Sequence, residues 1–489
     1  MSRLLCISVA LLTLLSAGRA VADPLEGSRP NIILVMTDDQ GMGDLACMGN
    51  PILKTPNLDR FYERSTRFTD FQVSPTCAPT RSALMSGRAP FKNGVTHTIQ
   101  QRERMALDTF TLPQALKSAG YATGLFGKWH LGDEDEYLPG NRGFDEVLMH
   151  GAGGIGQTGL GDFMVNKENC YFDNVLLHND TVVQTKGFCT DLFFQAGLAW
   201  IKKQEEVGTP YFAYLALNAP HGPFIAPDAY KKRFLDEGYN VDTAARYGMV
   251  ENIDDNFGLL WEKLNEWGAL ENTLLIFMTD NGMSMRAIKK NGKPVQKYNA
   301  GLRAGKNSPY EGGTHVPAFW YWKGVLGEGV DVDALTAHID IYKTFSELAG
   351  VNLPTEMQSL DGRSLLPLLK NPNADWDDRE LFFHCGRWST GQRDAYKFRN
   401  CAVRTKQWRL VNNKELYNIL TDPGETTDVS GSHPEVVERL RKSYAEWWSS
   451  VLPLMVNEGL PQAKKKPLVD RYNEQLKNQG IPEWGPDTL

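Results

Sequence analysis

Four short apolar runs, each ending in polar residues, restrict the fold of this chain more than any other feature of its sequence. They are NIILVMTDD (31–39), YATGLFGKWH (121–130), YFAYLALNAPH (211–221) and TLLIFMTDNG (273–282). Continuous β-rich apolar runs of this length are typical of buried parallel strands. Helical patterns at 111–120 and 246–268 lie between them. This alternation predicts an α/β fold, with a large mixed, mostly parallel sheet sandwiched by helices.

The pattern changes near residue 365, where short alternating runs replace the long buried ones. These runs lie at 381–388, 397–405, 407–413 and 414–420, and an amphipathic helical pattern follows at 433–451. They predict a smaller C-terminal domain of antiparallel sheet plus helix. We therefore expect a main domain at 23–375 and a C-terminal antiparallel-sheet subdomain at 376–489.

The first 22 residues have the pattern of a secretory signal peptide. Arg3 precedes an apolar run at 4–15, and small residues end at Ala22. The run is shorter than the roughly 18 apolar residues of a membrane span, and no later run reaches that length. We expect removal of residues 1–22, a secreted or periplasmic location, and no membrane span.

The chain carries a net charge of −7 and no basic block. An acidic chain of this kind binds nucleic acid poorly, so no nucleic-acid partner is expected. The cysteines lack C-x-x-C spacing, which argues against a structural zinc site. Two pairs, Cys170 with Cys189 and Cys385 with Cys401, are spaced for local disulfides.

Polar side chains stand at the carboxyl end of each of the four predicted strands. They are Asp38, Asp39, Lys128, His130, His221, Asp280 and Asn281. Alone, each is an ordinary turn residue, helix cap or satisfied histidine. Because the carboxyl ends of parallel strands form the ligand crevice of an α/β sheet, four such ends together predict one shared site.

The residue types in this predicted site indicate a metal ion and an anion as ligands. The carboxylates and the amide are hard oxygen donors, which suit calcium or magnesium better than zinc. Lys128, Arg81 and Lys306 add fixed positive charge for a tetrahedral oxyanion, and the two histidines can supply acid and base. The set lacks only a nucleophile, for which Cys77 is the candidate.

Cys77 stands at the predicted start of a short helix in SPTCAPTRSALMSG (74–87). Pro79 suits the first helical turn, and Arg81 lies one turn after Cys77 on the same face. A positive helix end and an adjacent cation favour a thiolate or another anion there. Three interpretations compete: a small buried structural cysteine, a nucleophilic thiol, or a residue converted into another group. The first is the commonest role of a lone cysteine.

The segment CAPTR followed by SALMSG resembles the sulfatase signature C-x-P-x-R, whose cysteine is oxidised to formylglycine. Other segments occur in the order found in that family: NIILVMTDDQG, GKWHLG, NAPHGPF, FMTDNG, GK followed by YEGG, and ELYNILTDPGE. The resemblance covers about residues 29–450 and is to the formylglycine-dependent sulfatases of the alkaline phosphatase superfamily. It implies an arylsulfatase-like sulfuric ester hydrolase that acts on sulfated carbohydrate or aryl sulfate esters, with its catalytic domain at 23–375.

The resemblance also implies catalytic roles. Cys77, converted to 3-oxoalanine (formylglycine) by a maturation enzyme, hydrates to a gem-diol nucleophile, and calcium and Arg81 lower the pKa of that diol. Lys128 and Lys306 are catalytic residues that hold sulfate oxygens and stabilise the charge of the transition state. His221 protonates the leaving alcohol. His130 takes a proton from the remaining hydroxyl when sulfate is released.

The same resemblance places one calcium ion, rather than magnesium, at the strand ends. Its implied ligands are Asp38, Asp39, Cys77, Asp280 and Asn281. The implied substrate-binding residues are Lys128, His221, Lys306 and His315. His315 stands in EGGTHVP where many relatives carry arginine, so the substrates of those relatives are not carried over.

Two other functions are compatible with these residues. One is a phosphonate or phosphate monoester hydrolase of the same superfamily, although GKWH favours the sulfatase. The other is a non-catalytic protein that binds sulfated glycans, against which the full set of metal, acid, base and nucleophile positions argues.

An outer pocket is expected from three segments, 96–105, 151–159 and 384–388. Their candidate sugar contacts are His97, Arg102, Arg104, Arg387 and Trp388. A solvated surface position is the commoner role for each of them alone.

Overall fold

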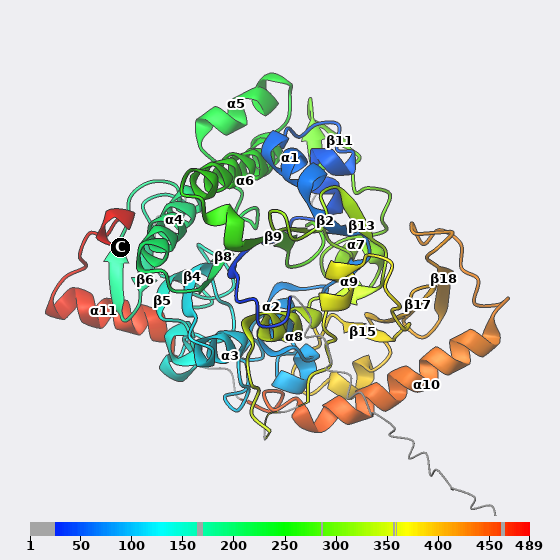
Figure 1. Cartoon of the computed structure of the whole chain (residues 1–489). Coiled ribbons are helices and arrows are strands. Elements are labelled where there is room, and N and C mark those ends of the chain that lie inside the picture. The colour runs from blue at the N-terminus through cyan, green and yellow to red at the C-terminus, as the bar shows by residue number, and fades with distance from the viewer. Residues whose placement is uncertain (1–24, 164–169, 285–286, 356, 358, 461–464) are drawn as a thin grey trace, which may run out of the picture.

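The computed structural model describes residues 25–163, 170–284, 287–355, 357, 359–460 and 465–489. The predicted signal peptide at 1–22 lies outside the described residues. A ten-stranded sheet forms the centre of the molecule (Figure 1). From one edge to the other its strands are β13 (Val330–Val332), β2 (Thr66–Phe68), β12 (Ala318–Tyr321), β9 (Thr273–Thr279), β1 (Asn31–Thr37), β8 (Tyr211–Ala216), β4 (Ala122–Lys128), β5 (Glu146–His150), β6 (Val175–His178) and β7 (Thr181–Gln184).

Strands β9, β1, β8, β4 and β5 form a continuous parallel block. On either side of this block, β12 and β6 run antiparallel to their neighbours. The prediction of a large mixed, mostly parallel sheet is therefore confirmed. The four apolar runs of the sequence are the neighbouring strands β9, β1, β8 and β4, so their carboxyl ends lie side by side.

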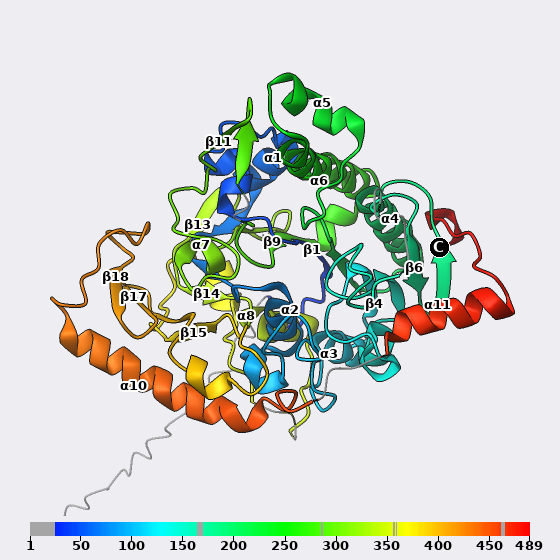
Figure 2. The same ribbon diagram turned by 180° about the vertical axis from the view of Figure 1, so that it is seen from behind.

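Helices cover both faces of the sheet, as Figures 1 and 2 show. One face carries α1 (Pro56–Arg64), α4 (Cys189–Val207) and α6 (Val241–Glu266), with α5 (Asp228–Asp236) packed on α6. The other face carries α2 (Cys77–Ser86), α3 (Leu112–Ser118) and α8 (Asp340–Ala349). The two predicted helices are α3 and α6, and α6 begins five residues earlier than expected, at Val241 after Asn240 in an extended conformation.

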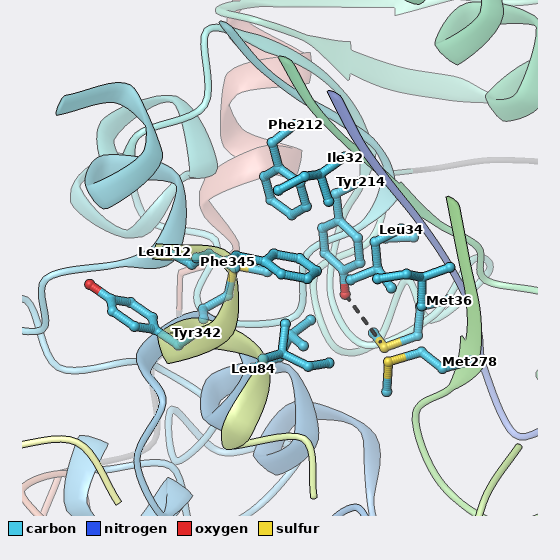
Figure 3. Packing of buried hydrophobic residues seen from close by; sticks show 14 of the residues in the cluster. Ile32, Leu34, Met36, Leu84, Leu112, Phe212, Tyr214, Met278, Tyr342 and Phe345 are labelled. Atoms are coloured by element: carbon cyan, nitrogen blue, oxygen red, sulfur yellow. Dashed lines mark hydrogen bonds between the residues drawn. The ribbon is translucent and has the colours of Figure 1, made fainter. Parts of the chain in front are cut away.

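The core on the α2 side locks this helix onto the sheet (Figure 3). Ile32 and Met36 of β1 share one face because strand side chains alternate. Leu84 of α2 and Phe345 of α8 pack onto that face. The hydroxyl of Tyr214 lies 3.8 Å from the sulfur of Met36, an interaction drawn in Figure 3. The side chains that enclose α2 thus come from both the sheet and a second helix.

A second, four-stranded antiparallel sheet follows in the chain, as predicted. It comprises β15 (Leu381–His384), β16 (Cys401–Arg404), β17 (Trp408–Val411) and β18 (Glu415–Asn418), and α10 (Pro434–Val451) packs on it. Shorter elements connect the large and small sheets: β3 (Phe71–Gln72), β14 (Thr336–Ala337), α7 (Glu311–Thr314) and α9 (Leu366–Lys370). A hairpin of β10 (Ile288–Lys290) and β11 (Lys293–Val295) lies apart from both sheets.

A buried ion cluster joins the small sheet to the large domain. Glu311 accepts hydrogen bonds from Arg404 Nε at 2.8 Å and Arg409 Nε at 2.9 Å, and all three side chains are almost fully buried. Arg404 also donates to Asp70 at 3.0 Å. Removing one partner from such a cluster leaves an uncompensated buried charge, which costs about 3–5 kcal/mol. The cluster therefore holds the small sheet against the residues at the start of β3 and of α7.

The last helix, α11 (Pro467–Asn478), returns to the far edge of the large sheet (Figure 1). Gln475 donates to the carbonyl of Val182 and accepts from its N–H, and the N–H of Trp484 donates to the carbonyl of Gln184. These contacts cover the exposed edge of β7, where unpaired backbone groups would otherwise be open to other strands. The division of the chain at residue 376 stays a prediction.

Two further expectations concern cysteines and membranes. Cys170, Cys189, Cys385 and Cys401 are all free in the structure, so neither expected disulfide is present there. Among the described residues, no helix has the length and apolar character needed to cross a membrane.

Candidate active site

The structure brings the predicted polar residues together at one edge of the sheet. Asp38 and Asp39 follow β1, Asp280 follows β9, and His130 follows β4, all on neighbouring strands. The loop after β8 adds His221 to the same edge. The convergence expected from four strand ends is therefore present.

Helix α2 carries Cys77 into this edge. The helix begins at Cys77 itself, and Thr76 precedes it in an extended conformation, with φ −152° and ψ 155°. Pro79 lies in the first turn, where a backbone N–H has no partner within the helix. Arg81, one turn later, is buried and binds Asp280 at 2.9 Å and the carbonyl of Lys128 at 2.9 Å. Arg81, the cation expected beside Cys77, thus also links the ends of β9 and β4.

Three potential metal ligands meet beside this helix end. Ligand atoms of Asp38, Cys77 and Asp280 lie within 4.8 Å of one another, and all three residues are buried. Within the described part of the chain, Asp38 Oδ1 and the neighbouring Asn281 Oδ1 are buried and have no hydrogen-bond partner. Orphaned buried oxygens of this kind are rare unless they bind something. Asp39 completes the group, because Asn281 donates to it at 3.0 Å.

Each carboxylate of this group has a cationic partner. Lys128 Nζ lies 2.6 Å from Asp38 Oδ2, and Lys306 Nζ lies 2.6 Å from Asp39 Oδ1. Burial and the nearby Asp38 together raise the pKa of Asp280 to about 7, although Arg81 opposes this rise. Burial would also raise the pKa of Asp39, but Lys306 lowers it far below its usual value. The group has the oxygen donors that calcium and magnesium prefer.

The two histidines are held by backbone carbonyls on one side of each ring. His221 Nδ1 donates to the carbonyl of Gly222 at 2.6 Å, and its Nε2 lies 3.9 Å from Asp39. His130 Nε2 donates to the carbonyl of Thr98 at 2.8 Å, while its Nδ1 has no partner among the described residues. These bonds leave His221 Nε2 and His130 Nδ1 as acceptors in the neutral rings.

Both rings are neutral at pH 7 in this structure. Burial lowers the pKa of His221 to about 3, helped by Lys306 and Lys128 and opposed by Asp39. Burial and Lys128 likewise hold the pKa of His130 well below its usual value. A neutral His130 is ready to accept a proton, whereas His221 must first gain one before it can act as an acid.

A cavity of about 560 Å³ opens above this group of residues. Asp39, Cys77, His130, His221 and Lys306 line it. The ammonium of Lys128 is fully buried on Asp38 and is not among the lining groups. Lys128 therefore lies beneath the pocket rather than in its wall.

Sequence reasoning missed five lining residues: Leu160, Gly222, Phe224, Ser284 and Asn307. Leu160 directly follows the expected segment 151–159, and each of the other four follows a predicted site residue by one to three positions. Their position next to these motifs could have indicated that they line the pocket, but the residue types themselves did not.

His315 does not lie with the predicted site residues. Its Nδ1 is 3.0 Å from Glu311, and its Nε2 donates to the carbonyl of Thr69 at 2.8 Å. It belongs to the ion cluster beneath the small sheet and is absent from the described lining of the cavity. The substrate-binding role expected for His315 has no support in this position.

The expected outer-pocket segments do line the catalytic cavity, through Thr98, Gly153, Gln157 and Arg387. Most of the residues proposed to contact a sugar instead bind other groups of the protein. Arg102 is buried, binds Glu458 at 2.7 Å, and donates to the carbonyl of Trp388 at 2.8 Å. His97 Nδ1 accepts from the N–H of Thr98, and Arg104 forms an ion pair with Glu134. Of that candidate group, Arg387 faces the described part of the cavity.

Comparison with known protein families agrees with this arrangement of residues. Residues 30–351 match the sulfatase family model, and residues 305–448 match the model described as N-sulphoglucosamine sulphohydrolase, C-terminal. The chain belongs to the sulfatase family. It is a sulfuric ester hydrolase, and its buried Asp38, Cys77 and Asp280 have the donors to hold a metal ion.

Characterised sulfatases resemble it over most of their length. N-acetylgalactosamine-6-sulfatase of Rattus norvegicus is 30% identical over 477 residues, covering 91% of this chain and 82% of the relative. Arylsulfatase A of Homo sapiens is 31% identical, with 88% and 89% covered. The crystal structure of Ps i-CgsB in complex with k-i-k-neocarrahexaose superposes with a TM-score of 0.76 at 28% identity, covering 92% of this chain and 98% of that one.

Two adjacent glycines of this sulfatase pack against its two histidines. A Cβ atom on Gly153 would lie 2.5 Å from the ring of His130, and one on Gly154 would lie 3.2 Å from the ring of His221. Asp162 holds the loop that carries both glycines, because it accepts the N–H groups of Gly151 at 2.9 Å and Gly156 at 2.7 Å. Because residues 153 and 154 have no side chains, both histidine rings can pack directly against this loop.

We expect Gly153→Ala to lower kcat/KM on an aryl sulfate roughly 10- to 100-fold, the cost of displacing a catalytic group by about 1 Å. The backbone of Gly153 is not in the left-handed region, so the added methyl acts by contact with His130 rather than by strain. Steady-state kinetics of purified protein measure the effect. Gly140→Ala is the control, because a Cβ there meets nothing within 4 Å. An unchanged rate for Gly153→Ala would contradict the positioning of His130 by this loop.

Proposed function

We propose that this sulfatase is secreted and removes sulfate from sulfated carbohydrates, using a formylglycine made from Cys77 and one bound calcium ion. The observation that carries the proposal is the position of Cys77 at the start of α2, with its ligand atom within 4.8 Å of those of Asp38 and Asp280. A group at that point faces both the cation ligands and the cavity.

A carbohydrate substrate is supported by the relatives and by the shape of the pocket. One relative is named for sulfated N-acetylgalactosamine, and the structure of Ps i-CgsB contains an oligosaccharide. The cavity, of about 560 Å³, has the size of a small-ligand pocket. Its polar lining is suited to a hydroxylated ligand. Secretion is supported by the leader pattern at 1–22.

Formylglycine at position 77 accounts for a cysteine that lies beside Asp38, Asp280, Arg81 and Lys306. As a hydrate, formylglycine supplies one hydroxyl to attack sulfur and a second that allows sulfate to be released. Arg81 and Lys306 contribute positive charge on either side of residue 77, which favours the ionised hydroxyl. Serine at this position provides one hydroxyl only, so it can attack but cannot release sulfate in this way.

The cation site fits calcium through its oxygen donors. Asp38, Asp39, Asp280, Asn281 and an oxygen of residue 77 would hold the ion. When bound, it supplies positive charge that polarises the sulfate ester. Asp38 can contribute its free Oδ1 while its Oδ2 keeps the hydrogen bond from Lys128, so the buried lysine holds this carboxylate in place.

Substrate binding would prepare His221 for its role as general acid. Lys306 lines the cavity beside it and is placed to hold a sulfate oxygen. The negative charge of a bound sulfate ester raises the pKa of His221, which is otherwise lowered by burial. A proton on Nε2 can then pass to the leaving alcohol, while His130 Nδ1 accepts the proton of the diol when sulfate is released.

Protein produced with a formylglycine-generating enzyme should carry an aldehyde at residue 77, and its activity should scale with the aldehyde fraction. Peptide mass spectrometry of 74–87, together with sulfate release from a panel of sulfated galactose and N-acetylgalactosamine saccharides, measures both. A phosphate monoester tests the alternative chemistry. Cys77→Ser should lose turnover, whereas Cys47→Ser, outside the cavity, should retain it. Full activity with an unmodified thiol would refute the nucleophile.

Chelation should abolish sulfate release, and added calcium should restore it. Asn281→Ala should require a higher calcium concentration to reach the same thermal stability, since the variant lacks an oxygen with no other partner. Calcium titrations followed by differential scanning fluorimetry measure this change. Asn252→Ala is the matched control, because Asn252 is also buried, donates to Asp191 and has an unpartnered Oδ1, but does not line the catalytic cavity. Equal calcium dependence of the two variants would contradict the proposed ligands.

His221→Ala should slow the hydrolysis of sugar sulfates far more than that of activated aryl sulfates. General acid catalysis contributes roughly 100- to 10,000-fold, and most when the leaving group is basic, as a sugar alkoxide is. His130→Ala should instead slow both classes, since it acts after the alcohol has left. Rates on a nitrophenyl sulfate and a sulfated sugar measure the difference. Equal losses on both substrates in His221→Ala would indicate a sulfate-binding group rather than an acid.

A further inference from the structure

A tyrosine from a distant part of the chain holds the backbone of His221. Tyr171 Oη donates to the carbonyl of His221 at 2.6 Å. The N–H of His221 donates to the carbonyl of Asn218 at 3.0 Å, so both backbone polar groups of the histidine have partners. The proposed mechanism assigns no role to Tyr171 or Asn218.

The side chain of Asn218 fixes the direction of the tyrosine hydroxyl. Its Nδ2 donates to Tyr171 Oη, and its Oδ1 accepts the N–H of Ile155 at 3.3 Å. A hydroxyl oxygen that accepts from Asn218 directs its own hydrogen toward the other partner, the carbonyl of His221. Because Ile155 follows Gly153 and Gly154, the same amide joins the loop of these glycines to the loop of His221.

Tyr171 is itself anchored at the start of α4. Its carbonyl accepts the N–H of Cys189 at 2.8 Å, and its ring stacks on Phe188 with 5.9 Å between the ring centroids. The side chains of Tyr171 and Asn218 are almost fully buried. Since α4 packs on β4 and β8, the tyrosine connects His221 to a fixed part of the core.

The ring of His221 depends on this backbone for its position. Its Nδ1 donates to the carbonyl of Gly222, the next residue, so the ring follows the course of the loop. Its side chain remains 15% exposed, because it lines the catalytic cavity. A displacement of the loop would therefore move His221 Nε2 away from a leaving oxygen in the cavity.

We infer that Tyr171 is a positioning residue for the transfer of a proton from His221 to the leaving alcohol, and that Asn218 orients the tyrosine hydroxyl for this role. The inference rests on the proposed function of His221 as general acid. Burial raises the pKa of Tyr171 well above its usual value, so its hydroxyl remains a hydrogen-bond donor at neutral pH. Because Tyr171 acts through His221, its effect depends on how much the leaving group needs a proton.

Tyr171→Phe should lower kcat for a sugar sulfate roughly tenfold, because a buried carbonyl loses its hydrogen bond and the loop of His221 shifts. Its kcat for a nitrophenyl sulfate, whose leaving group needs little protonation, should change less than about twofold. Asn218→Ala should show the same dependence on the leaving group. Steady-state kinetics with both substrates measure these ratios. Equal losses on both substrates, or no loss on either, would overturn the inference.

Tyr121→Phe is the matched control. Tyr121 is also buried, and its hydroxyl donates to a backbone carbonyl, that of Pro30, at 2.9 Å. It directly precedes β4, at the edge of the sheet opposite the active site. Its rates on both substrates should equal those of the wild type. If Tyr121→Phe gave the same ratio as Tyr171→Phe, loss of any buried tyrosine hydroxyl would explain the result, and the inference would be wrong.

A double variant measures whether Tyr171 acts through His221. Adding Tyr171→Phe to His221→Ala should not slow the hydrolysis of the sugar sulfate further, because the positioned group is already absent. Losses that multiply would contradict the inference.

The outcomes separate this inference from the proposed function. A dependence on the leaving group in His221→Ala, without one in Tyr171→Phe and Asn218→Ala, would overturn the positioning role alone. Equal losses on both substrates in His221→Ala would overturn the general acid, and the positioning role with it.

Discussion

Three carboxylates and three cations meet at the carboxyl edge of the central sheet, and the geometry of the active site depends on their pairing. Arg81 binds Asp280, Lys128 binds Asp38, and Lys306 binds Asp39. Because isolated buried charges cost several kcal/mol, each pair fixes the strand end or helix that carries its partners. A divalent cation held by these carboxyl groups would add positive charge to the pocket, which suits an anionic ester.

The position of Cys77 follows from the same packing. Helix α2 lies between the sheet and α8, with Leu84 pressed against both, and Arg81 ties its first turns to Asp280. The residue at the helix start therefore cannot move away from the cation ligands without breaking the core or a buried ion pair. This rigidity suits a nucleophile, because attack on sulfur requires alignment that is set before the substrate binds.

The sequence predicted the parts of the site that local patterns encode, and it missed those that depend on tertiary contacts. Four of the predicted site residues follow recognisable strands: Asp38, His130, His221 and Asp280. Because neighbouring parallel strands end at the same edge, the sequence predicted that these residues lie together, as they do in the structure. His315 lies beside a catalytic motif in sequence, yet its ring turns to Glu311. The direction in which the His315 side chain points depends on contacts with the small sheet, and the sequence pattern does not show where that sheet packs. The steric role of Gly153 was equally hidden.

The two histidines show how backbone hydrogen bonds can assign opposite roles to one residue type. The carbonyl of Thr98 holds the proton of His130 on Nε2, which leaves Nδ1 as an acceptor, and burial keeps the ring neutral. The carbonyl of Gly222 holds the proton of His221 on Nδ1, and its Nε2 lies near Asp39 and Lys306. Lys306 lowers the pKa of His221, so a bound sulfate that engages Lys306 would raise the pKa of this ring. In the proposed mechanism, His221 would therefore gain its proton when an ester is bound, whereas His130 would be able to accept a proton throughout.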